Sequence, residues 1–395
     1  TKTMGNHTFK FGGDLRRVRD DLLQTQTYNP RGKIEFGVSQ TSISGASTSY
    51  ANSLASFLLD VPYDEGRDYP VIFPAYRAWQ FFTFVQDKWV VTPKLTLDLG
   101  LRWEFYPAAT PAHNAGFSQY NPADNSFLIA GIGGVPSDVG IKTNYHDFAP
   151  RIGLAYRWNE KTVIRTGFGI SYSPFPDNTY AYNYPVKQNN FFTGNCSFCV
   201  ALLPNGQPAT FQAGFPAFQQ TVIPSNGIIA NADLNQSYVV INPQFKEPYV
   251  ESWNFAIQRA LPRNLTLDVA YVGNHGVDQP AQYNLNASQT LGGGVASQPL
   301  NQKFGKKASV TQYFVGYSSS YNGLQVKLDK RFSGGFGMTT AYTYSKSLGY
   351  QSEDAGIDFY INAKRNWRRL DFDRTHVFAQ SYLWELPFGK GRKYL

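Results

Sequence analysis

The chain has 395 residues, of which 36 are Lys or Arg and 28 are Asp or Glu, so its formal net charge is +8. Only 16% of the residues are charged and another 16% are aromatic, which is the opposite of the composition of disordered chains. The best apolar stretch, 54–61, is far shorter than the roughly 18 residues of a membrane-spanning helix, and two cysteines are too few for a disulfide scaffold. A large β protein rich in Gly and Tyr remains.

The N-terminal elements are predicted from the directions in which successive strands must run. Thr92-Pro93 and Gly5-Asn6 have the composition of tight turns, and we place both on the same side of a sheet. With both turns on the periplasmic side, the strand 6–16 runs away from that side, whereas the strands 33–40 and 76–91 run toward it. A further strand that runs away from the periplasmic side is then required between 33–40 and 76–91. In chain order we expect strands over 6–16, 33–40, 61–71 and 76–91, with a short apolar helix near 52–59.

Strict alternation of apolar and polar residues predicts the later strands, because a strand with two different faces alternates in this way. The clearest case is 94–105, in which every second residue from Leu95 to Phe105 is apolar. The same pattern predicts strands over 162–172, 265–271, 324–331 and 336–345, and a less distinct one over 373–386.

Strand lengths and connections favour a transmembrane barrel over a soluble sandwich, which also alternates. The strands run about 10–14 residues, against about 5–6 in soluble proteins and about 9–11 for a tilted membrane crossing. Short connections alternate with long ones, as in outer-membrane barrels. The short connections are 92–93, 159–160, 261–264 and 333–334, and the long ones are 107–147, 173–248, 275–318 and 348–372.

Aromatic side chains near the strand ends support the same prediction, because such rings suit the two membrane–water interfaces. These residues are Trp79, Trp89, Trp103, Tyr106, Trp158, Tyr172, Trp253, Tyr344 and Trp384. We therefore predict an all-β, transmembrane antiparallel β-barrel with long extracellular loops, short periplasmic turns and about 12 strands in this chain.

Seven ordered segments resemble the barrel of TonB-dependent outer-membrane receptors, and most closely the Oar-like branch, whose members often carry a carboxypeptidase-regulatory-like domain. The segments are FVQDKWVVTPKLTLDLGLRWE (84–104), YVGNHG (271–276), YNGLQV (321–326), KRF (330–332), YTYSKS (342–347), DFDRTH (371–376) and LPFGKG (386–391). Together they cover most of the chain from about residue 75 onward.

The resemblance implies a 22-stranded barrel, of which this chain holds about 12 strands, closed by an N-terminal plug. It also implies uptake of a siderophore, glycan or similar extracellular ligand, driven by the TonB–ExbB–ExbD complex through a missing N-terminal region. Residues 1–395 are then expected to be part of a single receptor barrel domain in the outer-membrane lipid, with the plug and the C-terminal strands missing. Three alternatives remain: a passive porin-like channel, a surface adhesion or secretion-related barrel, and a soluble β enzyme, for which the sequence offers no candidate acid pair.

Motifs for covalent chemistry are scarce. The sequence contains no His-Glu-x-x-His and no Gly-x-Ser-x-Gly, and its five histidines are scattered without metal-ligand spacing. The basic clusters 16–19 and 365–369 are each followed by aspartates, so neither is an isolated basic stripe for nucleic acid. We expect no enzyme activity, no cofactor and no nucleic-acid partner.

Cys196-Ser197-Phe198-Cys199 is the one distinct short motif. A thioredoxin-like site would open a helix in a βαβ unit, and a zinc site would need two further ligands nearby. A local disulfide in an oxidising compartment fits the motif best.

The connection 173–248 is a candidate ligand-binding loop, with ten Asn, nine Pro and only five charged residues. Neutral amides and flat aromatic faces suit a hydroxyl-rich ligand such as a glycan, and long loops are often functional. The candidate contacts are Tyr180, Tyr182, Tyr184, Phe191 and Phe192. The alternative is a loop that packs on neighbouring loops.

A cation site is a further hypothesis in the connection 348–372. Glu353, Asp354 and Asp358 could hold Ca²⁺ through oxygen ligands. The alternative is an ordinary polar loop.

Overall fold

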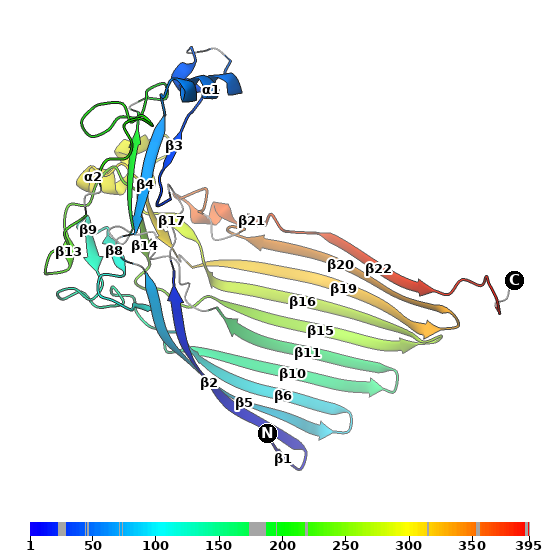
Figure 1. Ribbon diagram of the computed structural model, residues 1–395. Coiled ribbons are helices and arrows are strands. Elements are labelled where there is room, and N and C mark those ends of the chain that lie inside the picture. The colour runs from blue at the N-terminus through cyan, green and yellow to red at the C-terminus, as the bar shows by residue number, and fades with distance from the viewer. Residues whose placement is uncertain are drawn as a thin grey trace.

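The computed structural model describes the whole chain except residues 23–28, 44, 46, 71, 73, 174–186, 195, 218–219, 314–315, 353–355, 392–393 and 395. One large antiparallel sheet forms a curved wall, with tight turns at one end and folded loops at the other (Figure 1). In the described residues, no helix has the length and apolar character that a membrane crossing requires.

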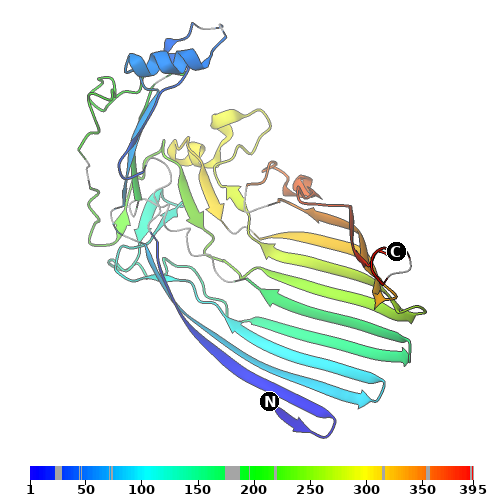
Figure 2. The same ribbon diagram turned by 45° about the vertical axis from the view of Figure 1, so that its right-hand side comes forward.

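The large sheet contains ten long strands that follow one another almost in chain order. The long strands are β2 (His7–Asp21), β5 (Ala75–Thr92), β6 (Leu95–Phe105), β10 (Asp147–Asn159), β11 (Thr162–Tyr172), β15 (Tyr249–Leu261), β16 (Leu265–Gln279), β19 (Tyr317–Ser333), β20 (Phe336–Gly349) and β22 (His376–Trp384). Three short strands join them: β1 (Lys2–Met4), β7 (Thr110–Pro111) and β21 (Arg368–Arg369). Figure 2 shows β1 and β22 at opposite edges of this open wall.

The strands predicted over 33–40 and 61–71 do not belong to the wall, so that part of the prediction is wrong. β2 pairs directly with β5 along its whole length. β3 (Lys33–Glu35) and β4 (Asp64–Pro70) instead form a small sheet with β12 (Lys187–Thr193). The reason lies in the sequence DEGRDYP of β4, whose four charged residues leave no apolar face for lipid. The predicted helix is present as α1 (Tyr50–Leu58).

One face of the wall is apolar from strand to strand, as the alternation predicts. Leu99, Ile152 and Phe168 are direct neighbours across β6, β10 and β11, and all three are exposed. Between them the other face carries polar or small residues, such as the pair Asp98 and Gly153. We call the apolar side the lipid face and the polar side the inner face.

The aromatic residues predicted at the membrane interfaces lie on the lipid face, with one exception. The strand registers place there Trp79, Trp89, Trp103, Trp158, Tyr172, Trp253, Tyr344 and Trp384. Tyr106 is buried on the inner side, where it donates a hydrogen bond of 2.7 Å to Glu104 and packs edge-on against Phe82. The interface prediction is therefore wrong for Tyr106, which shares the inner side with Glu104 because the two are two residues apart.

The long connections fold into small elements of their own at one end of the wall. Two further three-stranded sheets are β8 (Ser118–Asn121), β9 (Ser126–Ile129) and β13 (Ile228–Ile229), and β14 (Tyr238–Ile241), β17 (Gln282–Asn284) and β18 (Val310–Tyr313). The short helices are η1 (Ser39–Thr41), η3 (Gly294–Ser297), α2 (Pro299–Phe304) and η4 (Ala363–Asn366). The most deeply buried aromatic side chains of the described residues lie mainly in these loops, not in the wall.

Candidate functional site

The connection 173–248 holds the folded loops together. It supplies one strand to each of the three small sheets, namely β12, β13 and β14. β14 runs parallel to β18, so two connections far apart in the sequence are joined by backbone hydrogen bonds. The described part of this connection therefore packs on neighbouring segments. We call the folded connections 106–146, 173–248 and 280–316 the loop assembly.

Aromatic rings fill the centre of the loop assembly. Tyr120, Phe127 and Tyr238 come from β8, β9 and β14 and are at most 5% exposed. The Phe127 and Tyr238 rings meet edge-on at 4.7 Å, and the Tyr120 ring lies 5.0 Å from that of Tyr238. These ring contacts hold β8, β9 and β14 together.

A buried lysine, Lys306, packs against this aromatic cluster and joins it to the backbone of the same loops. Lys306 is fully buried, and its Nζ donates hydrogen bonds to the carbonyl oxygens of Asp233 (3.0 Å) and Gln236 (2.7 Å). The same Nζ lies 4.1 Å from the centroid of the Tyr238 ring. Burial lowers the pKa of Lys306 to about 8, against the opposing effect of Asp233.

The buried side-chain amide of Asn286 connects the end of β17 to the segment 300–308. The Nδ2 of Asn286 donates to the carbonyl oxygens of Lys306 and Ala308, both at 2.9 Å, and its Oδ1 accepts from the Leu300 amide. All polar atoms of this side chain are thereby satisfied within the loop. α2 and the segment after it are held against β17 as a result.

Of the five candidate ligand contacts, the structure describes two. Phe191 and Phe192 lie next to each other in β12, opposite Gly66 and Glu65 of β4, and so point to opposite faces of that sheet. Phe191 is 43% exposed. Tyr180, Tyr182 and Tyr184 lie outside the described residues, so the five are not brought together on one described surface.

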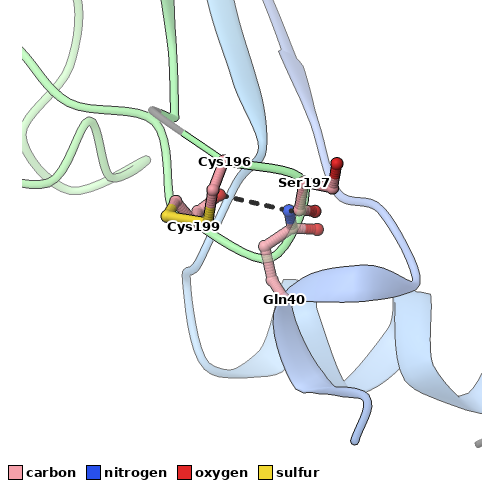
Figure 3. Close-up of a disulfide and its surroundings, with 4 residues drawn as sticks. All are labelled: Gln40, Cys196, Ser197 and Cys199. Atoms are coloured by element: carbon pink, nitrogen blue, oxygen red, sulfur yellow. Dashed lines mark hydrogen bonds between the residues drawn. A yellow bond between two sulfur atoms is a disulfide. The ribbon is translucent and has the colours of Figure 1, made fainter. Parts of the chain in front are cut away.

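The two cysteines lie beside α1 and η1, at the far end of the small sheet that contains β4 (Figure 3). Cys196 and Cys199 form a disulfide. Gln40 Nε2 donates hydrogen bonds to the carbonyl oxygens of Ser197 (3.4 Å) and Cys199 (3.2 Å). The cysteine turn is thereby attached to a segment more than 150 residues earlier in the chain.

A hollow of about 480 Å³ opens between 288–294 and 358–365. Its apolar lining includes the exposed side chains of Leu291, Phe359 and Ile361. Arg365 also lines it and has no ion-pair partner in the described part of the chain. A guanidinium beside apolar side chains suits a ligand with an apolar body and an anionic or hydroxyl group.

The proposed cation ligands are only partly described. Asp358 forms an ion pair with Arg368, whereas Glu353 and Asp354 lie outside the described residues. Among the residues that the structure describes, no cluster of three or more His, Cys, Asp or Glu could hold a metal ion.

Two buried carboxyl groups lie where the loops meet the wall. Asp147 opens β10 and Glu247 precedes β15, and they are 1% and 3% exposed. The amide of Asn144 donates to Asp147. Glu247 and Asp147 interact with each other. Burial raises the pKa of Glu247, so the free energy of the interaction between the two carboxyl groups depends on protonation.

The sequence carries no local sign of the roles of Lys306 and Asn286, or of the interaction between Asp147 and Glu247. Each is a single polar residue whose partners come from distant segments, so no local motif marks it. The one available signal was the scarcity of charge in 173–248, where Glu247 is one of only five charged residues.

Comparison with protein families gives a match over the full chain. The model of the family described as "Outer membrane beta barrel domain" matches residues 1–395. A search of curated proteins finds no match.

Solved outer-membrane proteins are similar to parts of the chain. The ferripyoverdine receptor of Pseudomonas aeruginosa is 10% identical with a TM-score of 0.41, over 82% of this chain and 28% of that one. The FrpB iron transporter of Neisseria meningitidis is 10% identical with a TM-score of 0.41, over 88% and 35%. The alcaligin outer-membrane receptor FauA of Bordetella pertussis is 9% identical with a TM-score of 0.35, over 82% and 42%. The chain thus spans well under half the length of these proteins.

Proposed function

The chain belongs to the outer membrane β-barrel domain family and is a protein of the cell outer membrane. From this premise we propose that it is part of a receptor for energy-coupled uptake. The loop assembly captures an extracellular ligand, and the barrel passes that ligand across the outer membrane. Neither step requires covalent chemistry from this chain.

The contrast between the two ends of the wall is the observation that carries this proposal. Adjacent long strands are joined at one end by turns of two or three residues, such as 93–94 and 262–264. At the other end the connections form three small sheets, two of which contribute side chains to buried clusters that contain aromatic rings. A passive pore needs no such folded assembly, whereas a receptor needs a rigid surface that holds its ligand.

The ligand contacts that we propose lie in the loops. Phe191 and Phe192, together with Tyr180, Tyr182 and Tyr184 from the same connection, supply aromatic faces. The hollow beside Arg365 adds apolar side chains and one positive charge. A siderophore or a glycan has the rings, hydroxyls and anionic groups that such surfaces bind.

The second part of the proposal concerns the energy source for uptake. The wall is open at β1 and β22, and further strands of the whole protein would pair with these two edges and close the barrel. A plug inside the barrel would then be displaced by TonB with ExbB and ExbD. Residues 1–395 are, in this proposal, one part of a single Oar-like receptor barrel.

Uptake by cells that express the complete protein tests this proposal. Cells are given radiolabelled ferric siderophores and labelled oligosaccharides, with and without a protonophore. We expect at least one label to accumulate, and its accumulation to stop when the protonophore is added. Replacing Phe191 and Phe192 together by Ala should weaken capture, whereas Phe211→Ala, which removes a ring that is 68% exposed in the same connection, should not.

The other outcomes separate the alternatives. Accumulation that persists with the protonophore would favour a passive channel. Binding of cells to a surface without accumulation of any label would favour an adhesion protein.

A further inference from the structure

A second hollow, of about 220 Å³, lies where β16, β19 and β20 meet the loops. Among the described residues that line it are three serines and two glutamines, together with two tyrosines, a proline, a leucine and a phenylalanine, and none of them is charged. We call this hollow, between Tyr317 and Tyr350, the tyrosine hollow. Pockets for drug-sized ligands hold roughly 300–1,000 Å³, so the tyrosine hollow accommodates one ring of a larger ligand.

The tyrosine hollow lies on the inner side of the wall. Tyr344 of β20 faces lipid, so Gly349, five residues later, and its cross-strand partner Ser319 face inward. A Cβ at position 349 would lie 3.0 Å from the Cδ2 of Leu370, so the Leu370 side chain covers this inward position. Ser319 and Leu370 both line the hollow, which is therefore turned toward the barrel interior and away from lipid.

Two stacked rings form the aromatic part of the hollow. The ring centroids of Tyr317 and Tyr350 are 4.8 Å apart, with 24° between the ring planes. The Tyr350 ring also meets Trp367 edge-on at 5.4 Å. Tyr317 is the first residue of β19 and Tyr350 follows the last residue of β20, so the wall holds both rings in place. Rings fixed in this way offer flat apolar surfaces to the C–H groups of a sugar at little entropic cost.

The two glutamines of the hollow have their donors engaged. The Nε2 of Gln279 donates hydrogen bonds to the carbonyl oxygens of Tyr249 (3.0 Å) and Val277 (3.1 Å). The Nε2 of Gln351 donates to the carbonyl oxygen of Pro280 at 2.6 Å, and its Oε1 is buried without a hydrogen-bond partner in the described structure. Acceptors of this kind are stabilised by a hydroxyl donor and not by a carboxylate or phosphate.

Neutral polar side chains continue below the hollow on the inner face. Ser252, Asn274 and Tyr321 are direct neighbours across β15, β16 and β19. The loop end of β6 and β10 differs, because the inner face there carries the ionisable pair Glu104 and Asp147. Hydroxyl and amide groups both donate and accept hydrogen bonds, as sugar hydroxyls do. The uncharged surface of the hollow thus extends toward the barrel interior on this part of the wall.

We propose that the tyrosine hollow and the row of Ser252, Asn274 and Tyr321 bind an uncharged oligosaccharide. One sugar ring packs on Tyr317 and Tyr350 with its hydroxyls toward the two glutamines, and the next rings follow the row along the inner face. An anionic siderophore would lose hydration here without gaining a positive partner. This inference rests on the proposed uptake function and narrows its ligand to a neutral glycan.

Calorimetric titration of the complete protein in mild detergent tests the proposal with defined sugars. The uncharged probes are maltohexaose, xylohexaose and chitohexaose, and the anionic probe is hexagalacturonate, which has the same number of rings. We expect at least one uncharged probe to bind. Hexagalacturonate should bind at least about tenfold more weakly than that probe, because its carboxylates are desolvated among uncharged side chains.

Variants of the hollow and of the row locate the bound sugar. Tyr350→Ala removes a ring surface and should weaken binding of that probe about tenfold. Tyr321→Phe keeps the ring and removes one hydroxyl of the row, so it should weaken binding about fivefold. The matched control is Tyr50→Ala, because Tyr50 is 82% exposed and begins α1, remote from the wall (Figure 1). The control should bind as the wild type does.

Two results would overturn the proposal. One is a wild type that binds none of the three uncharged probes, or binds hexagalacturonate as tightly as the best of them, which decides the question even if Tyr350→Ala does not fold. The other is unchanged affinity in both Tyr350→Ala and Tyr321→Phe.

Failure of this proposal is distinguishable from failure of the uptake function. A ferric siderophore that accumulates in cells, while no uncharged probe binds the purified protein, would overturn the glycan site and leave energy-coupled uptake in place. An uncharged probe that binds through the tyrosine hollow but does not accumulate would support the site and contradict uptake.

Discussion

The ammonium nitrogen of Lys306 lies 4.1 Å from the centroid of the Tyr238 ring. This contact joins two connections that leave the wall at different strands, because Tyr238 belongs to 173–248 and Lys306 to 280–316. Two hydrogen bonds to backbone carbonyls strengthen the same junction. The junction therefore makes the loops one folded unit.

Replacing Lys306 by Met should loosen the loop assembly without unfolding the wall. The change removes two charge-assisted hydrogen bonds and a cation–π contact, and it leaves the partly buried carbonyl groups of Asp233 and Gln236 without this donor, at a cost of about 3 kcal/mol. We expect faster proteolysis within 228–241 and an unchanged temperature of heat modification in gels. Lys307 is the neighbouring exposed residue, so Lys307→Met serves as the control and should leave the rate of proteolysis unchanged. Equal proteolysis rates in the two variants would contradict the role assigned to Lys306.

The same lysine should make loop stability depend on pH. Its pKa falls to about 8 in the folded protein because it is buried, against an ordinary value of 10.5. Between these values the unfolded chain binds more protons than the folded one, so the free energy of unfolding of the loops rises as pH rises from 8 to 10. Proteolysis at pH 8, 9 and 10, with the protease activity calibrated on a peptide, should slow in the wild type and stay constant in Lys306→Met.

Glu65 should give the small sheet of β3, β4 and β12 the opposite pH dependence. Its side chain is fully buried, and neither carboxylate oxygen has a hydrogen-bond partner in the described structure. Burial, with a smaller effect of Asp60, raises the pKa of Glu65 to about 7 from 4.5. The folded state then keeps the Glu65 proton to a higher pH than the unfolded state does. The resulting stabilisation of the sheet is complete below pH 4.5 and is lost as pH rises through 7.

Hydrogen exchange of peptides from β4 and β12, corrected for intrinsic rates, measures this effect. Protection should fall between pH 5 and 8 in the wild type and change little in Glu65→Gln. Glu35, in the same sheet, is the control, because its hydrogen bond to Lys33 lowers its pKa. Glu35→Gln should therefore keep the decline between pH 5 and 8, and a wild type without that decline would show that Glu65 is not protonated in the fold.

Cys196 and Cys199 should not react with thiol reagents on intact cells. A bridge between residues three apart closes a very short loop, worth about 2 kcal/mol in loop entropy. Maleimide labelling should therefore require prior reduction, and Cys196→Ser with Cys199→Ser should increase proteolysis only near 194–200. Free labelling before reduction would exclude the bridge.

The strands of the wall were predictable because lipid imposes a rule on every second residue. The row of Leu99, Ile152 and Phe168 shows this rule across three strands. Several strands extend beyond the predicted range, as β16 does from 271 to Gln279, because the part above the membrane has no reason to alternate. The direction rule failed for β3 and β4, since it assumed that every strand crosses the membrane.

The loop assembly was less accessible to sequence analysis. The motif of Cys196 and Cys199 could be interpreted locally, because the partners are three residues apart. Lys306 could not, because the carbonyls that it binds lie 70 and 73 residues away. Neither carbonyl has a sequence signature, since every residue carries one.

The lipid face supplies the last prediction, at Trp253 of β15 and Gly273 of β16. The two residues are direct cross-strand partners, and the indole covers the glycine. A Cβ at position 273 would lie only 2.5 Å from the indole Cε2 and Nε1 atoms, so Gly273→Ala must displace the ring, at a cost of about 1–3 kcal/mol. We expect a lower temperature of heat modification in the complete protein.

A double-mutant cycle distinguishes this clash from a general intolerance of the strand to alanine. In a Trp253→Leu background the added methyl group meets a smaller side chain, so Gly273→Ala should cost less there than in the wild type. Gly100→Ala serves as the control, because a Cβ at position 100 would meet its nearest neighbour at an ordinary 3.6 Å. Equal costs for Gly273→Ala with and without the indole would show that Trp253 does not determine the need for glycine at this position.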